Sequence, residues 1–232
     1  MKKIFLLVLL GFGFNVWAQN EGLISAIEMD DVSKIKKLVN SGRISVDEKV
    51  GNDEPIILVA ARAGSEKVAN FLISRNVNVN AQNSVKETAL MMAVFFADSD
   101  DGAHVVRDRM AKTLVEAGAH FENEGWWAPL AYAAYAGRLE IARYLVQHGA
   151  LVDGIVVDKV TLVNTPLMMA SLQGHDKFVR YLLRQGADAN LKNKNEATAY
   201  SLAEKSNNKH LLKYLSCAMN LSSGETYIDK CE

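Results

Sequence analysis

Residues 165–190 read TPLMMASLQGHDKFVRYLLRQGADAN, which is typical of a helix, a turn, a second helix and a second turn. Pro166 suits the first turn of a helix, where its missing N–H leaves no hydrogen bond unmade. Gly174 and Gly186 follow the two apolar stretches, as expected of left-handed residues that end helices. Two helices this short cannot bury their apolar faces alone. The stretch therefore predicts a structural unit that is stable only when further copies stack against it.

The rest of the chain supplies these copies at a spacing of about 33 residues. Each copy has an apolar or aromatic residue one step after a reference position, an alanine four steps after it and a leucine sixteen steps after it. The third copy fits only with an insertion between its two helices. The reference positions are Gly22, Ile56, Ala89, Pro129, Pro166 and Ala199. The alanines are Ala26, Ala60, Ala93, Ala133, Ala170 and Ala203, and the leucines are Leu38, Leu72, Leu114, Leu145, Leu182 and Leu215.

This period and these residues resemble the ankyrin repeat. TPLMMASLQG with YLLRQGAD, and APLAYAAYAG with YLVQHGAL, follow the pattern of that family closely. The resemblance covers about residues 21–215 and implies an all-α repeat solenoid of helix-turn-helix units joined by β-turns or hairpins. We predict six repeats within an ankyrin-repeat domain of residues 19–216, at about 21–51, 52–84, 85–124, 125–161, 162–194 and 195–216.

The chain departs from the family at the histidine of the first helix. Hydrogen bonding between repeats is usually credited to that histidine, so we expect it to be absent and apolar packing to replace it. The first and last copies have irregular turns and are expected to be caps with a solvated outer side. The replacing residues are Ser25, Leu58, Met91, Ala131, Met168 and Ser201.

Residues 1–18 are predicted to be a signal peptide that is cut near Ala18. Lys2 and Lys3 precede a short apolar run, and Val16, Trp17 and Ala18 fit the cleavage positions. The run is too short for a good membrane span, so we expect a periplasmic protein without a membrane anchor. The net charge of −1 offers none of the basic field typical of nucleic-acid binding.

Cys217 and Cys231 are the two cysteines of the chain. In an oxidising compartment this pair predicts one structural disulfide, which makes residues 217–232 a bridged C-terminal tail. A redox or metal pair is the alternative. The spacing does not fit CxxC chemistry, and no histidine stands beside either cysteine.

The resemblance implies that a partner protein contacts the first helices and the protruding turns. The third and fourth copies place several aromatic residues at those positions, and such side chains are typical binding hot spots. The alternative is that the Phe pair covers the base of the insertion and that Trp126 packs on its own turn, while Tyr132 is assigned to the core. The candidate partner-binding residues are Met29, Arg62, Phe95, Phe96, Trp126, Trp127, Tyr135 and Leu172.

Two segments interrupt the repeat. The insertion at about 97–109 is interpreted as an acidic surface loop. Asp98, Asp100 and Asp101 before Gly102 resemble a calcium loop, but the closing glutamate is missing, so we predict no metal site. The long apolar turn at 151–164 is interpreted as an extended hairpin beside the tryptophan pair.

No catalytic constellation is present in the sequence. The five histidines are scattered over different copies, and there is neither a phosphate-binding glycine loop nor an HExxH motif. We therefore expect a binding protein that is not an enzyme, needs no cofactor and is a monomer when free.

The expected partner is another periplasmic protein. The chain resembles exported bacterial ankyrin proteins, including those that protect a cell from its own penicillin-binding-protein-type peptidoglycan endopeptidases. This favours an inhibitor or immunity protein against a cell-wall hydrolase. The alternatives are an accessory partner of an oxidative-stress enzyme such as catalase, and a secreted effector that binds a host protein.

Overall fold

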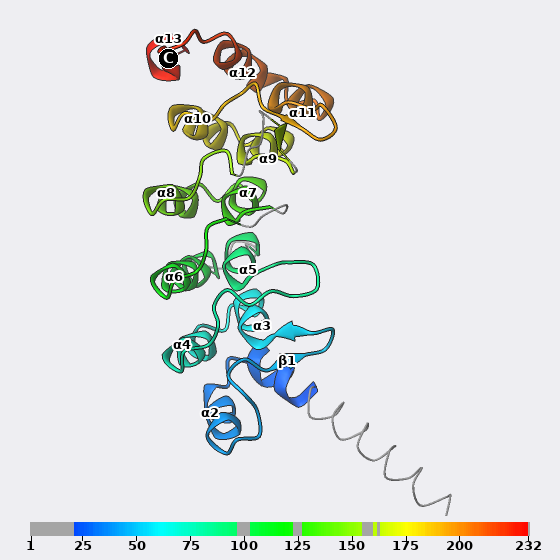
Figure 1. Cartoon of the computed structure of the whole chain (residues 1–232), viewed down its shortest axis with the longest axis vertical. Coiled ribbons are helices and arrows are strands. Elements are labelled where there is room, and N and C mark those ends of the chain that lie inside the picture. The colour runs from blue at the N-terminus through cyan, green and yellow to red at the C-terminus, as the bar shows by residue number, and fades with distance from the viewer. Residues whose placement is uncertain (1–20, 97–102, 123–126, 155–159, 162, 232) are drawn as a thin grey trace, which may run out of the picture. The chain divides into compact units, whose positions relative to one another are not determined.

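The computed structural model describes residues 21–96, 103–122, 127–154, 160–161 and 163–231 (Figure 1). These residues form two compact units. Unit 1 contains residues 21–93 and 103–119, and unit 2 contains residues 94–96 and the described residues from 120 onward. The predicted signal peptide and Asp98, Asp100, Asp101 and Trp126 lie outside the described residues.

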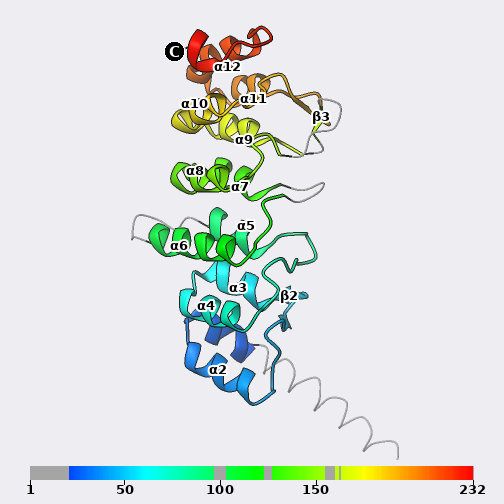
Figure 2. The ribbon, with the colours of Figure 1, turned by 60° about the vertical axis from the view of Figure 1, so that its left-hand side comes forward.

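Unit 1 is built from pairs of short helices. The second helices α2, α4 and α6 lie along one side and α3 lies on the other (Figures 1 and 2). β1 and β2 form an antiparallel hairpin in which Lys49 pairs with Pro55. The elements are a helix at 21–28, α2 (Val32–Asn40), β1 (Lys49–Val50), β2 (Glu54–Pro55), α3 (Ile56–Ala63), α4 (Glu66–Ser74), the beginning of α5 (Ala89–Phe95) and α6 (Ala103–Glu116).

Unit 2 continues with the same arrangement of helix pairs. α9 packs between α7 and α11, and α10 packs on α9. Its elements are the end of α5, α7 (Pro129–Tyr135), α8 (Leu139–Gln147), β3 (Val160–Thr161), α9 (Pro166–Gln173), α10 (Asp176–Arg184), β4 (Lys192–Asn193), α11 (Ala199–Lys205), a 3-10 helix (Lys209–Leu211), α12 (Leu212–Met219) and α13 (Tyr227–Cys231).

The predicted repeat is confirmed by the positions at which the helices begin. α3, α5, α7, α9 and α11 begin at five of the six reference positions. All six repeated alanines are buried, and so are the five leucines from Leu72 onward. Leu38 of the first copy and Tyr200 of the last are only half-buried, as expected of terminal repeats with a solvated side.

The turns after the second helices are left-handed, as the sequence predicts. Gly118, Gly149 and Gly186 have φ between 87° and 102°, and Asn76 takes the same role with φ 60°. Asn tolerates this conformation better than most residues. Thr165 accepts a hydrogen bond from the backbone N–H of Met168 and caps α9, and Pro166 is its first residue.

Hydrogen bonds between neighbouring repeats are present although the family's histidine is replaced in every copy. They come from a different position, at or near the start of each second helix, and not from the position of the family's histidine. We call the donors anchor residues. Each binds a carbonyl within the last three residues of the preceding first helix: Ser65 Oγ to Ile27 O, Arg107 Nη2 to Arg62 O (2.9 Å), Arg138 Nη1 to Val94 O (3.0 Å), His175 Nε2 to Tyr135 O (3.0 Å), and Asn208 Nδ2 to Ser171 O and Leu172 O (both 2.9 Å).

The anchor residues satisfy carbonyls that a helix end leaves without an intrahelical partner. Ser65, Arg107 and Arg138 are buried. A buried polar group without a hydrogen-bond partner would lower the free energy of unfolding. His175 must carry its proton on Nε2, because the carbonyl of Tyr135 can only accept. Each anchor residue therefore fixes the first helix of one repeat to the second helix of the next.

The contact of His175 leaves little room for a side chain at Gly137. A Cβ there would come within 2.8 Å of His175 Cε1, and φ is +71°. We expect Gly137→Ala to lower the free energy of unfolding by about 1–2 kcal/mol, through backbone strain and displacement of the imidazole. Gly154→Ala is the matched control, because its φ is +69° and nothing lies within 4 Å of the added Cβ. Equal losses for both variants in urea unfolding would contradict the role of His175.

The loop predicted for the insertion at 97–109 does not extend to Arg109, because residues from Ala103 onward are helical. α6 begins at Ala103 and is 14 residues long, whereas α4, α8 and α10 have 9 each. Val106, Met110 and Leu114 recur every four residues, which is helical spacing, and Met110 and Leu114 are buried. The end of the insertion therefore extends the second helix.

The turn at 151–164, predicted to be an extended hairpin, is described only in part. Its described strand, β3, pairs in parallel with β4 of the next loop, with Val160 opposite Lys192 and Thr161 opposite Asn193. A parallel partner must come from a separate segment of chain, so this pairing joins two successive loops. Residues 155–159 and 162 of the turn lie outside the described residues.

None of the helices among the described residues is long and apolar enough to span a bilayer. Within the same residues, no group of three or more His, Cys, Asp and Glu is placed to hold a metal ion.

Candidate protein-binding surface

Five aromatic rings of unit 2 lie together, and we call them the aromatic cluster: Phe95, Phe96, Trp127, Tyr132 and Tyr135. The ring centre of Phe95 is 5.0 Å from that of Phe96, 5.5 Å from Tyr132 and 5.9 Å from Tyr135. Trp127 lies 5.6 Å from Tyr132 and 6.3 Å from Tyr135. All five side chains are half-buried. The structure thus brings together four of the predicted aromatic residues.

Most of these ring pairs meet edge to face, which is a favourable arrangement for aromatic side chains. The interplanar angle is 85° between Phe95 and Phe96, and 70° between Trp127 and Tyr132. Tyr132 was expected in the core, but it is half-buried and contacts both Phe95 and Trp127. The rings therefore support one another while each keeps part of its surface in solvent.

Two anchor residues hold the backbone that carries the aromatic cluster. Arg138 binds the carbonyl of Val94, directly before Phe95. His175 binds the carbonyl of Tyr135 itself. Side chains on a backbone fixed in this way lose little freedom when a partner binds. The aromatic cluster is accordingly preorganised for contact.

The other candidates from the sequence are not part of the aromatic cluster. Leu172 is half-buried on α9, and Trp126 lies outside the described residues. Arg62 and Met29 belong to unit 1. Arg62 forms an ion pair with Glu54, and Met29 is 78% exposed.

A groove of about 290 Å³ in unit 1 surrounds Arg62. Its polar residues, Glu28, Glu54 and Arg62, occupy repeat positions at which partner contact is expected. The lining residues are Ile24, Glu28, Glu54, Val59, Arg62 and Ala63.

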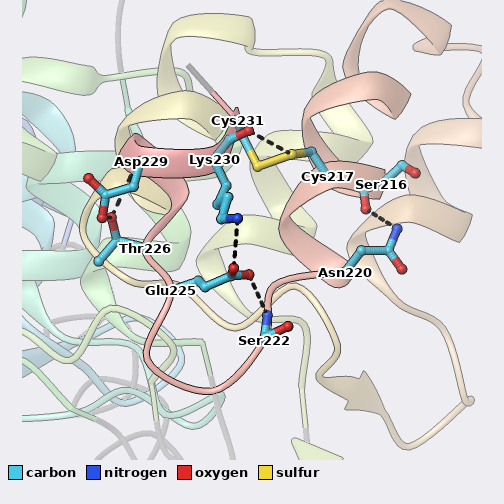
Figure 3. The surroundings of a disulfide bond; sticks show 9 residues. All are labelled: Ser216, Cys217, Asn220, Ser222, Glu225, Thr226, Asp229, Lys230 and Cys231. Atoms are coloured by element: carbon cyan, nitrogen blue, oxygen red, sulfur yellow. Dashed lines mark hydrogen bonds and ion pairs between the residues drawn. A yellow bond between two sulfur atoms is a disulfide. The ribbon is translucent and has the colours of Figure 1, made fainter.

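A cavity of about 410 Å³ lies in unit 2 between the turn after α10 and the C-terminal tail. It could not be predicted from the sequence, because its walls come from two separate segments of the chain. Leu183, Ala187, Leu221 and Tyr227 are among its lining residues. The predicted bridge between Cys217 and Cys231 is present and ties α13 to α12 (Figure 3).

Loop carboxylates join successive repeats in both units. Asp47 accepts a hydrogen bond from the backbone N–H of Asn78 at 2.8 Å, and Asp153 accepts from that of Asp188 at 3.2 Å. Burial raises the pKa of Asp153 to about 6, against the effect of this hydrogen bond. Burial likewise raises the pKa of Glu122, which accepts from the N–H of Leu151. In unit 2, burial therefore disfavours the ionised form of both carboxyl groups.

This shift makes the stability of unit 2 depend on pH. The folded pKa of Asp153 lies above the unfolded value of 3.8, so the folded state binds the proton more tightly. Its contribution to stability is full below about pH 4, is lost as the pH rises through about 6, and stays lost above. Asp153→Asn is expected to stabilise the protein at pH 7 by about 1–2 kcal/mol, discounted because the carboxyl is partly exposed.

The gain from Asp153→Asn should shrink towards zero at pH 4, which urea unfolding at several pH values measures. Asp47→Asn is the matched control, since Asp47 holds a corresponding loop contact but is exposed. A gain of the same size at pH 4 and pH 7 would contradict the buried charge.

The comparisons with known proteins agree with the repeat architecture. A family described as ankyrin repeat matches residues 54–84 and 126–158, and one described as ankyrin repeats (3 copies) matches residues 150–224. Together these matches cover more than half of the chain. The chain belongs to the ankyrin-repeat family.

Similar relatives are found in animals. A mouse (Mus musculus) ankyrin repeat and SAM domain-containing protein 6 is 41% identical over 76 residues, which is 32% of this chain and 8% of that protein. The Drosophila melanogaster ankyrin repeat and KH domain-containing protein mask is 34% identical over 111 residues, 47% of this chain and 2% of that protein. Human (Homo sapiens) oxysterol-binding protein-related protein 1 is 47% identical over 51 residues, 22% of this chain and 5% of that protein.

The chain spans less than a tenth of the length of these relatives, so the likeness concerns the repeats. Ankyrin repeats are in general protein-binding modules without enzymatic activity. The chain is accordingly a protein–protein interaction module, and the aromatic cluster is its candidate contact surface.

Proposed function

We propose that the chain is a periplasmic protein that binds a peptidoglycan hydrolase through the aromatic cluster and inhibits it. The observation that carries the binding role is the group of five half-exposed rings on a backbone held by Arg138 and His175. Rigid aromatic anchors are the usual centre of a protein interface.

The periplasmic location rests on the predicted signal peptide, and the bridge between Cys217 and Cys231 is consistent with an oxidising compartment. A hydrolase is the favoured partner because it endangers the cell that makes it. The resemblance to exported self-protection ankyrin proteins supports a penicillin-binding-protein-type DD-endopeptidase as the target.

The test mixes the chain from residue 19 onward with a purified DD-endopeptidase and measures the cleavage of cross-linked muropeptides. We expect a stoichiometric complex and loss of cleavage. Neither a complex nor a loss of activity would overturn the inhibitor role. A complex with a periplasmic catalase alone, or with a host protein alone, would favour an accessory or an effector role instead.

A further inference from the structure

Unit 1 separates its charges by side. Basic residues predominate on the second helices, whereas acidic residues predominate on the first helices and loops. The exposed basic residues of the second helices and their ends, which we call the basic face, are Lys34, Lys36, Lys37, Lys67, Arg75, Arg109 and Lys112. The acidic residues of the other side are Glu28, Asp47, Glu48, Asp53, Glu54 and Glu87. Asp30 instead lies at the start of α4, where its carboxylate accepts hydrogen bonds from the backbone N–H groups of Lys67 and Val68.

The helices of the basic face are neighbours. α4 packs against both α2 and α6, and the three lie side by side in both views (Figures 1 and 2). Glu66, Asp108 and Glu116 are the acidic residues of α4 and α6, and Glu66 is engaged by Arg109 at 2.8 Å. α2 has three lysines and no acidic residue within its bounds, and Asp31 caps its N-terminus. A positive charge therefore remains across three adjacent helices.

Two cations meet at the centre of the basic face. Lys36 Nζ lies 5.7 Å from the ring centre of Phe71, and the guanidinium carbon of Arg75 lies 5.4 Å from it. Asn40 Oδ1 accepts a hydrogen bond from Arg75 at 3.1 Å. In the part of the chain that the structure describes, Lys36, Lys37, Lys67 and Arg75 form no ion pair. Like charges held this close create a local potential that attracts an anion.

We propose that the basic face is a docking surface for a bilayer that contains anionic phospholipids. A protein interface needs an apolar core, but the large apolar side chains that are exposed among those the structure describes, Met29, Val85, Leu151 and Ile228, lie outside α2, α4 and α6. Lysine, which predominates here, acts as a hydrated point charge. Unlike arginine, it does not bind one phosphate group through two parallel hydrogen bonds. A plane of lipid phosphates matches such a surface by charge alone.

This contact is peripheral and requires no spanning segment. It is separate from the aromatic cluster, which belongs to unit 2. Each cation near an anionic membrane strengthens association by roughly fivefold, and the effect decays within a Debye length. Binding should therefore fall steeply as salt is added.

The test is cosedimentation of the chain from residue 19 onward with vesicles of phosphatidylglycerol and phosphatidylcholine, or of phosphatidylcholine alone. We expect sedimentation with the anionic vesicles only, and release when the salt rises from about 50 mM to about 500 mM. Lys37→Glu with Lys67→Glu should reduce the partition at least tenfold. Lys37→Gln with Lys67→Gln should reduce it less, and thermal unfolding verifies that both variants fold.

The matched control is Lys194→Glu with Lys205→Glu, which makes the same change of net charge at exposed positions of unit 2. Equal losses for the two pairs would show that net charge and not the basic face decides binding. Absence of sedimentation with anionic vesicles would overturn the proposal. So would binding of inorganic polyphosphate or a short RNA at a salt concentration at which the vesicles no longer bind.

Discussion

Replacing Phe96 and Trp127 together by Ala is expected to weaken binding of the partner by at least about 2 kcal/mol, or roughly thirtyfold. Both rings are half-exposed, and they contact Phe95, Tyr132 and Tyr135. Their removal therefore takes away the outer surface of the aromatic cluster and also loosens the remaining rings. Calorimetric titration with the target hydrolase measures the loss.

The matched control replaces Val85 and Ile228 by Ala, since these are exposed apolar side chains outside the aromatic cluster. It should leave the affinity unchanged. Thermal unfolding of both double variants separates binding from stability. If the variant at Phe96 and Trp127 binds normally once folded but melts much earlier, the rings are part of the core and the proposed contact surface is wrong.

Reduction of the bridge between Cys217 and Cys231 is expected to lower the free energy of unfolding by about 3 kcal/mol. The bridge closes a short loop, with a sequence separation of 14 residues. α13 has only 5 residues, too few to remain helical alone. Its packing on α12 and α10 buries Tyr227, which is 3% exposed. Loss of α13 therefore also removes part of the wall of the cavity of unit 2.

Urea unfolding with and without reductant measures the loss, and hydrogen exchange should show it first in α12 and α13. Glu225→Gln is the control for the tail, because it removes the exposed ion pair with Lys230 and leaves the bridge intact (Figure 3). Exposed pairs of this kind contribute little. Coincident unfolding curves for the oxidised and reduced protein would show that the tail does not support the last repeat.

The sequence predicted the parts of the fold that follow a local period. Helix starts, buried alanines and left-handed turns each depend on a few neighbouring residues, so their spacing alone located them. The grouping of Phe95, Phe96, Trp127 and Tyr135 was predictable for the same reason. Phe95 and Tyr135 occupy equivalent positions of two successive repeats, with Phe96 next to the first of them, and stacking makes such positions neighbours. Trp127 lies in the turn before the first helix of the fourth copy, the other position at which partner contact is expected.

The anchor residues could not be predicted in this way. Their side chains are chemically unlike, and their acceptors are backbone carbonyls, which no sequence pattern identifies. Arg107 and Arg62 O, for example, are 45 residues apart. The basic face was also missed, because the net charge of −1 hides a separation of charge that appears only when the second helices line up.

The variety of the anchor residues has a consequence for how such an array changes in evolution. Each boundary between repeats has its own donor: a hydroxyl at Ser65, guanidinium groups at Arg107 and Arg138, an imidazole at His175 and an amide at Asn208. These groups differ in length and reach. Deleting, duplicating or reordering a repeat would bring together a donor and a helix end that do not match. The repeats share one architecture but are not interchangeable. A folding chain that stacks them in the wrong order forms fewer of these hydrogen bonds than one that stacks them in their native order.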